Sequence, residues 1–252
     1  QRLEQDIVDL GQIGRNTSDG GVYRMAFTEA DLEGRRWLMD RINEIGLKAS
    51  MDGAGNVFGL DDRAGTRSSF LVGSHLDSTP CGGVLDGPLG VLAALEAMRV
   101  IVENDIPLKE NLELVATSDE EGRFGGMLGA EAICGELSLD RIMRSKDING
   151  KALRDCLREC DLEPIDVLKA QRHRDFMSGF LELHIEQGPV LEQKNRDVGI
   201  VESISGVFHW RVLLIGESNH SGTTPMDMRK DAFQGLSEFS GEIPRILEEN
   251  GT

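Results

Sequence analysis

The sequence of 252 residues is short of basic side chains, with 27 Lys and Arg against 44 Asp and Glu and a formal net charge of −17. Nucleic-acid phosphates and anionic membrane surfaces both attract basic faces, so this balance predicts that the chain binds neither. No run approaches the roughly 20 apolar residues of a membrane span. The opening residues, QRLEQDIVDLGQIG, lack the basic and then apolar segments of a secretory signal.

Cysteine is also scarce, and its spacing is uninformative for metals. The four cysteines form no CxxC pair and no dense disulfide framework, which predicts a reducing, cytoplasmic location. Cys156 and Cys160 are one helical turn apart, so helix packing explains them better than metal binding. A hydrophobic content of 39 % is ordinary for a globular protein with a buried core.

Short apolar runs alternate with helical patterns along most of the chain. This order predicts an α/β fold, with a mainly parallel, doubly wound sheet flanked by helices. The predicted helices cover 29–45, 88–102 and 126–137, with a polar and partly helical stretch at 153–174. The predicted strands cover 70–72, 112–116 and 180–185, and 48–60 reads as two strands around a Gly-rich turn.

The pattern changes near residue 207. Residues 209–216 (HWRVLLIG) predict a strand, and a helix is expected to begin at Pro225 after the cap Thr224. That helix is expected to bend or restart at Gly241 and Pro244. One strand and one helix cannot bury their own apolar faces. We therefore predict a domain at 1–206, and the first half of a smaller α+β domain at 207–252.

Side chains that bind metals or move protons follow the predicted strands. Because parallel strands end at one edge of a sheet, we expect these side chains to meet there. Asp86 can also converge on this edge, because the Gly-rich segment before it lets the backbone fold back. Such His, Asp and Glu ligands suit zinc or manganese. The set is His75, Asp77 and Asp86 around the first strand, Glu120 and Glu121 after the second, and His184 in the third.

The spacing of these residues predicts different roles for them. Asp77 lies two residues after His75, on the same side of an extended chain, and could support the imidazole. Adjacent Glu120 and Glu121 diverge, so one can bind a metal while the other transfers a proton. Each feature alone also fits a capped turn, a surface pair or a core histidine. It is their joint occurrence, with His184, that favours a metal site.

Four segments carry a resemblance to a known family: GSHLDSTPCGGVLDGPLG, TSDEEGRFGGMLGAEAI, LELHIEQGPVLE and GESNHSGTTPMDMRKDA. In this order they resemble the amidase/hydantoinase/carbamoylase family. That family holds N-carbamoyl-L-amino acid hydrolases, β-ureidopropionases and allantoate amidohydrolases, within the co-catalytic metallopeptidase superfamily. The segment before residue 60 is similar to the family's opening as well, so the resemblance covers nearly the whole chain.

The resemblance implies a dinuclear hydrolase with an aminopeptidase-like catalytic domain and a lid domain that forms a homodimer. Two divalent ions are implied, zinc or manganese, with cobalt or nickel as further options. One ion would bind His75, Asp86 and His184, and Asp86 would bridge to the second ion, which Glu121 also binds. Glu120 would be the general base. Gln187 and His220 match substrate-contacting positions, and His220 would polarise the scissile carbonyl from the lid.

The chain also departs from the family. The family's last metal-binding His, the rest of the lid and an Arg for the substrate carboxylate are not found in these residues. We therefore expect a piece of a longer protein with little activity by itself. The glutamate motif reads EEGRF rather than EEGSRF, which leaves the ureido or carbamoyl substrate open. Two alternatives remain: a peptidase or N-acyl amino acid hydrolase of the same superfamily, and a non-catalytic metal-binding module.

Overall fold

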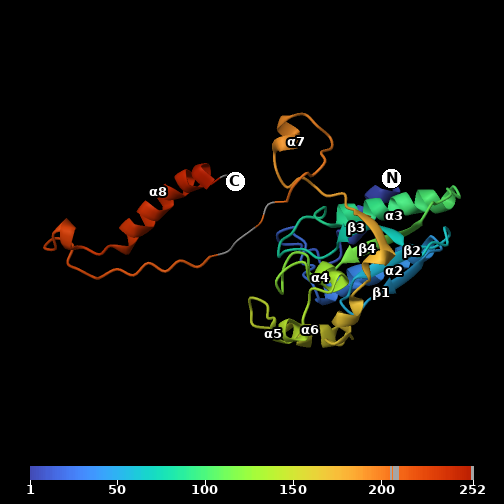
Figure 1. The fold of residues 1–252 in the computed structure, drawn as a ribbon, viewed down its shortest axis with the longest axis horizontal. Coiled ribbons are helices and arrows are strands. Elements are labelled where there is room, and N and C mark those ends of the chain that lie inside the picture. Colours follow the sequence, from blue (N-terminus) through green and yellow to red (C-terminus); the bar gives the residue numbers. More distant parts are fainter. Residues whose placement is uncertain (205, 207–209, 251–252) are drawn as a thin grey trace. The chain divides into compact units, whose positions relative to one another are not determined.

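The computed structural model describes residues 1–204, 206 and 210–250, and the chain divides into two compact units (Figure 1). Unit 1 is Gln1–Gln193 and unit 2 is Lys194–Thr252. The predicted domain boundary, between residues 206 and 207, falls inside unit 2. The assignment of the second part to a lid or dimerisation domain stays a prediction.

Unit 1 is built on a five-stranded sheet with the strand order β1-β2-β4-β3-β5. β3, β4 and β5 are parallel, whereas β1 pairs with β2 and β2 with β4 in antiparallel fashion. The short link between β1 and β2 permits only a hairpin. The α/β class is confirmed, and the sheet is mixed. Its strands are β1 Lys48–Met51, β2 Val57–Asp61, β3 Ser69–His75, β4 Asn111–Thr117 and β5 Met177–Leu181.

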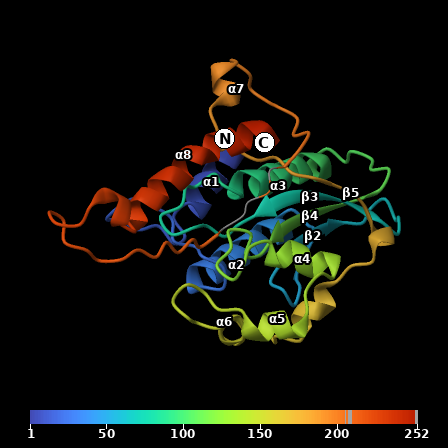
Figure 2. The same cartoon turned by 60° about the vertical axis from the view of Figure 1, so that its left-hand side comes forward.

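Helices cover both faces of this sheet (Figures 1 and 2). Successive side chains of β4 point to opposite faces. Leu114 and Ala116 join the core formed with α1, α2 and α3, whereas Val115 packs with Ile133 of α4. The helices of unit 1 are α1 Arg2–Leu10, α2 Glu29–Glu44, α3 Pro88–Glu103, α4 Leu128–Cys134, α5 Leu139–Arg144, α6 Leu153–Glu159 and α7 Val190–Gln193.

Local chemistry sets the ends of the main helices. The Thr28 hydroxyl accepts a hydrogen bond from the Asp31 N–H at 3.4 Å and caps α2. Pro88 occupies the first position of α3, where its missing N–H costs nothing. α4 is shorter than predicted, because it ends at Gly135 in the left-handed conformation with φ 76°. Pro164 interrupts the stretch predicted as helical, which forms α6 and two short 3-10 helices, η1 Asp166–Ala170 and η2 Arg174–Phe176.

The third predicted strand lies earlier than expected. β5 ends at Leu181, and its pairing with β3 ends at Val72. Beyond this point the chain passes over the first turn of α3, where a Cβ on Gly90 would lie 2.3 Å from the Leu183 carbonyl oxygen. The prediction that His184 lies inside a strand is therefore wrong, because this crossing takes the backbone out of the ladder.

Unit 2 also differs from its prediction. His209 lies outside the described residues, and residues 210–216 form no strand, since no partner strand pairs with them in the described part. The helix expected from Pro225 begins only at Ala232, because the Arg229 guanidinium donates to carbonyls of the preceding turn. A 3-10 helix, η3 Met226–Met228, precedes it. α8 then runs from Ala232 to Asn250 through Gly241 and Pro244 without the predicted restart.

No helix in the described part of the chain has the length and apolar character that crossing a bilayer requires.

Candidate metal centre

His75 is the last residue of β3 and is only 2 % exposed. Its Nδ1 lies 3.0 Å from the backbone carbonyl oxygen of Asp77. Nδ1–H donates to that carbonyl, so the lone pair is on Nε2. A metal-binding imidazole has this tautomer, in which one ring nitrogen donates to a protein group and the other is the ligand.

A glycine brings Asp86 next to this imidazole. Asp86 stands two residues before the start of α3, and Gly87 follows it with φ 78°. A Cβ on Gly87 would lie 2.5 Å from atoms of the His75 ring. Only a residue without a side chain lets the loop pack this closely against the ring. Gly87 therefore sets the approach of the Asp86 carboxylate to His75.

His184 completes the group from the segment after β5. Its Nδ1 lies 2.8 Å from the Ile185 carbonyl oxygen and donates to it. Its Nε2 lies 3.2 Å from Asp86 Oδ1, and the rings of His75 and His184 are 6.1 Å apart between centroids. His184 Nε2 thus faces Asp86, whereas His75 Nε2 faces Glu120 Oε2 at 3.5 Å.

Three of the predicted ligands therefore converge. One ligand atom each from His75, Asp86 and His184 lies within 4.8 Å of the other two. Among the described residues, buried Asp86 Oδ1 has no hydrogen-bond donor. Two imidazole nitrogens and an unpartnered carboxylate oxygen form a donor set that fits a divalent ion such as zinc.

Asp77 is connected to the turn after β4. Its Oδ1 accepts a hydrogen bond from the Glu120 N–H at 3.2 Å, and its Oδ2 accepts one from the Glu121 N–H at 3.1 Å. The distance from Oδ1 to His75 Nδ1 is longer, 3.7 Å. The Asp77 carboxylate thus acts first on the backbone of the two glutamates. Support of the imidazole by this carboxylate stays a prediction.

The two glutamates lie differently with respect to the group of three. Glu120 Oε2 is 3.5 Å from His75 Nε2. Glu121 lies outside the group, although it is close enough for charge interactions. Burial raises the pKa of the Glu121 carboxyl, His75 lowers it, and the carboxylates of Asp86, Glu120 and Asp77 raise it further. Such crowding of acidic groups favours a cation nearby. The role of Glu121 as a ligand stays a prediction.

Gln187 contacts the group directly. It adopts φ 55°, and its Nε2 donates to Asp86 Oδ2 at 2.8 Å. The neighbouring Glu186 has a structural task, since its carboxylate accepts hydrogen bonds from the first N–H groups of α7. Gln187 thus orients the carboxylate whose other oxygen is unpartnered. Its predicted contact with a substrate is not tested by this arrangement.

His220 belongs to unit 2, where its own backbone fixes the imidazole. Nδ1 accepts hydrogen bonds from the N–H groups of Gly222 and Thr223, both at 3.1 Å. Nδ1 is therefore an acceptor, and the ring proton is on Nε2. His220 can donate one hydrogen bond from that atom. Its predicted role at the scissile carbonyl stays a prediction.

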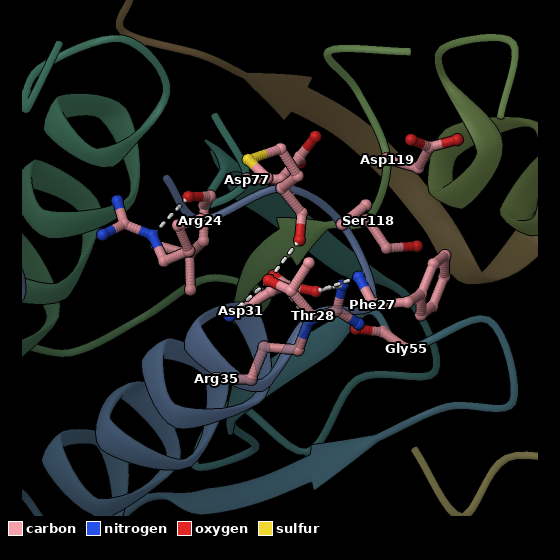
Figure 3. Close-up of polar contacts among 12 residues, drawn as sticks. Arg24, Phe27, Thr28, Asp31, Arg35, Gly55, Asp77, Ser118 and Asp119 are labelled. Carbon is pink, nitrogen blue, oxygen red and sulfur yellow. Dashed lines mark hydrogen bonds and ion pairs between the residues drawn. The ribbon is translucent and has the colours of Figure 1, made fainter. Parts of the chain in front are cut away.

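Buried charged side chains lie around Asp77, and no pattern in the sequence indicates them (Figure 3). Asp31 of α2 accepts hydrogen bonds from the Arg35 guanidinium at 3.1 and 2.5 Å. Arg24 is fully buried and donates to the Leu76 carbonyl at 2.8 Å. Burial raises the pKa of Asp77, while His75 lowers it. Arg24 thus fastens the loop that carries Asp77, through the Leu76 carbonyl.

Asp119 is another buried acidic group close to Asp77. It is fully buried with φ 51°, and its carboxylate accepts a hydrogen bond from the Phe124 N–H at 3.0 Å. Burial, followed by the charge of Asp77, raises the pKa of Asp119 to about 7. Asp119 therefore belongs to the framework of the turn.

Comparison with known proteins decides the family. Residues 71–248 match the family described as Peptidase family M20/M25/M40. The chain belongs to this family. The matched region includes every residue of the candidate site.

Similar proteins within the M20/M25/M40 family confirm the resemblance seen in the sequence. The chain is 39 % identical to an N-carbamoyl-L-amino-acid amidohydrolase of Paenarthrobacter aurescens, over 99 % of this chain and 61 % of that protein. It is 36 % identical to an allantoate amidohydrolase of Bacillus subtilis, over 93 % of this chain and 57 % of that protein. The crystal structure of a hydantoinase/carbamoylase family amidase from Burkholderia ambifaria aligns with a TM-score of 0.79 and 33 % identity. The alignment covers 99 % of this chain and 60 % of that chain. The chain thus spans about 60 % of the length of these relatives.

Proposed function

We propose that the intact protein hydrolyses a C–N bond of a ureido or amide substrate of the N-carbamoyl-L-amino acid or allantoate type. The observation that carries the proposal is the convergence of His75, Asp86 and His184, one ligand atom of each lying within 4.8 Å of the other two. The curated relatives named as amidohydrolases support the substrate class.

Divalent ions bound at such a site supply Lewis-acid activation of water and of the scissile carbonyl. We propose zinc or manganese at His75, Asp86 and His184, with Glu121 binding a second ion. Glu120 is the proposed general base, supported by its carboxylate oxygen 3.5 Å from His75 Nε2. The ion types remain open, because the same ligands also suit cobalt and nickel.

The chain's own residues then perform the proton transfers. Glu120 takes a proton from water while the water oxygen bonds to the carbamoyl carbon. Glu120 then returns a proton to the leaving amine as the C–N bond breaks. The released carbamic acid gives ammonia and carbon dioxide. His220 donates its Nε2–H to the oxyanion. A fixed donor in a site without water stabilises such a developing charge strongly. The resemblance supports delivery of His220 through a homodimer of the lid domain.

Two further proposals concern the setting of the enzyme. We propose a cytoplasmic location, supported by four free cysteines, of which Cys81 and Cys134 are exposed. We also propose that the 252-residue chain has little activity by itself, because it spans only part of its relatives' length.

Replacing Glu120 tests the chemistry. In the full-length protein, Glu120→Gln is expected to lower kcat by about 10²–10⁴-fold, the usual contribution of general acid–base catalysis. Metal content is expected to stay constant, because the site of His75, Asp86 and His184 is untouched. Ammonia release from N-carbamoyl amino acids and from allantoate measures the turnover. Glu33→Gln, at an exposed position of α2, is the matched control and is expected to be neutral.

The same assay separates the alternatives. Cleavage of dipeptides or N-acetyl amino acids without ammonia release would assign the protein to the peptidase or N-acyl hydrolase class. No hydrolysis, with one bound ion or none, would indicate a metal-binding module. Turnover near that of the unmodified protein in Glu120→Gln would remove Glu120 from its role.

A further inference from the structure

The turn that carries Glu120 and Glu121 is fixed from two sides by buried side chains. On one side the Asp77 carboxylate accepts both of their N–H groups. On the other side lies Asn56, in the turn between β1 and β2. We propose that Asn56 is a positioning residue for the two glutamates. This inference rests on the proposed function, since it concerns the same base and the same second ligand.

Asn56 is fully buried, and its carboxamide joins three distant segments. Its Oδ1 accepts a hydrogen bond from the Ser118 N–H at 3.0 Å. Its Nδ2 donates to Asp52 Oδ2 at 2.9 Å and to the Gly129 carbonyl at 3.1 Å. Because the Nδ2 group makes two donations and Oδ1 one acceptance, a flipped carboxamide would lose all three hydrogen bonds.

The packing around this amide is as tight as its hydrogen bonding. A Cβ on Gly129 would lie 2.1 Å from Asn56 Oδ1 and 2.4 Å from the Ser118 nitrogen. The Gly129 N–H donates to the Ser118 carbonyl at 2.8 Å, and the Ser118 hydroxyl donates to the Ala54 carbonyl at 2.6 Å. Gly55 and Ser118, which mark this junction, are labelled in Figure 3. The amide therefore has no room to shift without moving Ser118.

Ser118 is where the chain leaves β4 and the glutamate turn begins. The next residue, Asp119, adopts φ 51°, which no strand continues. A rotation at Ser118 is therefore transmitted to Glu120 and Glu121 within two or three residues. Misplacement of catalytic groups by about 1 Å can cost on the order of 10²-fold in rate. A side chain that holds Ser118 is accordingly placed to control the geometry of both glutamates.

The test is Asn56→Ala in the full-length protein. We expect kcat to fall by ~10–100-fold, as for loss of other groups that orient metal-site residues, while KM changes little. A titration with Co²⁺, followed by its visible absorption, is expected to show unchanged binding of the first ion. Binding of the second ion is expected to weaken by ~10-fold or more, because Glu121 lies on the displaced turn.

Asn111→Ala is the matched control. Asn111 is the first residue of β4, at the end opposite to the glutamates, and is 7 % exposed. Its Nδ2 donates to the Thr66 carbonyl at 2.8 Å. The variant also loses a buried amide from the same strand, so its melting temperature is expected to fall. Its kcat and both Co²⁺ affinities are expected to stay unchanged.

If Asn56→Ala does not fold, Ser118→Ala serves instead, since it removes the link to Ala54 without a large cavity. This variant is expected to lower kcat and the affinity for the second ion, each by a smaller factor than Asn56→Ala. Unchanged kcat and unchanged second-ion affinity would overturn the proposal, and so would equal losses in Asn111→Ala or equal weakening of both ions. The Co²⁺ titration needs no substrate. A wild type that hydrolyses no ureido compound would therefore refute the proposed function while still testing Asn56.

Discussion

The two units differ in where their apolar side chains lie. In unit 1, core residues such as Leu95 and Leu114 are fully buried between the sheet and its helices. In unit 2, none of the described residues from 194 to 249 is buried, and Trp210 is 82 % exposed. α8 still forms, because its helical hydrogen bonds are local. Helix formation in unit 2 thus reflects local sequence, whereas the fold of unit 1 reflects contacts between distant segments.

The same difference separates the two sets of functional residues. His75, Asp86 and His184 meet because β3, the start of α3 and the segment after β5 are packed together. The His220 imidazole accepts hydrogen bonds from the N–H groups of residues two and three positions later. A site made by packing depends on the whole core, whereas the His220 turn depends on its own few residues.

Removing the imidazole proposed to bind metal is the change with the largest expected effect on this comparison. His184→Ala is expected to weaken zinc binding by more than about 100-fold, since even groups that only orient ligands contribute 10–100-fold. Competition with a chromogenic chelator measures the affinity. The melting temperature without metal is expected to stay constant, because the His184 side chain is 31 % exposed.

His173→Ala is the control for that experiment. His173 is another exposed histidine of unit 1, but its Nδ1 accepts a hydrogen bond from the nearby Asp175 N–H and its ring lies edge-on to Phe176. Its removal is expected to leave zinc affinity unchanged. Equal affinities in both variants would show that the convergence of the three ligands does not form the metal site.

Much of this convergence could be predicted from the sequence. β3 and β4 were recognisable as apolar runs, and their parallel order places His75 and the glutamate turn at one edge. His184 lies near His75 and Asp86 as predicted, but it does not belong to a strand. It reaches the edge from a segment that crosses α3, and Gly90 permits the close approach because a Cβ there would clash with the Leu183 carbonyl.

The supporting residues could not be predicted, because their partners are far away along the chain. Asp52 and Asn56 read as an ordinary turn, which they do form. No spacing rule indicates that the same amide reaches Ser118 and Gly129, which lie 62 and 73 residues further on. The start of α8 was missed for a different reason, since Pro225 and Thr224 are good starting residues that the hydrogen bonds of Arg229 override.

Truncating one apolar side chain in each unit tests the contrast in burial. Leu95→Ala is expected to lower the free energy of unfolding by about 2–5 kcal/mol, because it leaves a cavity in the core of unit 1. Phe233→Ala in α8 is expected to change it by less than about 0.5 kcal/mol, because that side chain is 75 % exposed. Urea denaturation measures both. A loss above about 2 kcal/mol in Phe233→Ala would mean that unit 2 has a core in solution.

A smaller effect is expected from the buried thiols of unit 1. Burial raises the pKa of Cys160 from its ordinary value of 9.0 to about 11. Below pH 9 the thiol is protonated in both states and contributes no pH dependence. Between pH 9 and 11 the unfolded thiol loses its proton while the folded one keeps it, so the free energy of unfolding falls as pH rises. The expected fall is on the order of 2 kcal/mol, since one pKa unit corresponds to ~1.4 kcal/mol.

Many other groups titrate in this range, so the measurement must be a difference between variants. Cys160→Ala removes the buried thiol, and Cys134→Ala removes an exposed one at the end of α4. Urea denaturation at pH 8, 9.5 and 11 is expected to give a shallower decline for Cys160→Ala than for Cys134→Ala. Because both variants lose one thiol, they share the other titrating groups of the chain. Parallel declines would mean that folding does not raise the pKa of Cys160, and that the core around α6 is looser than its packing indicates.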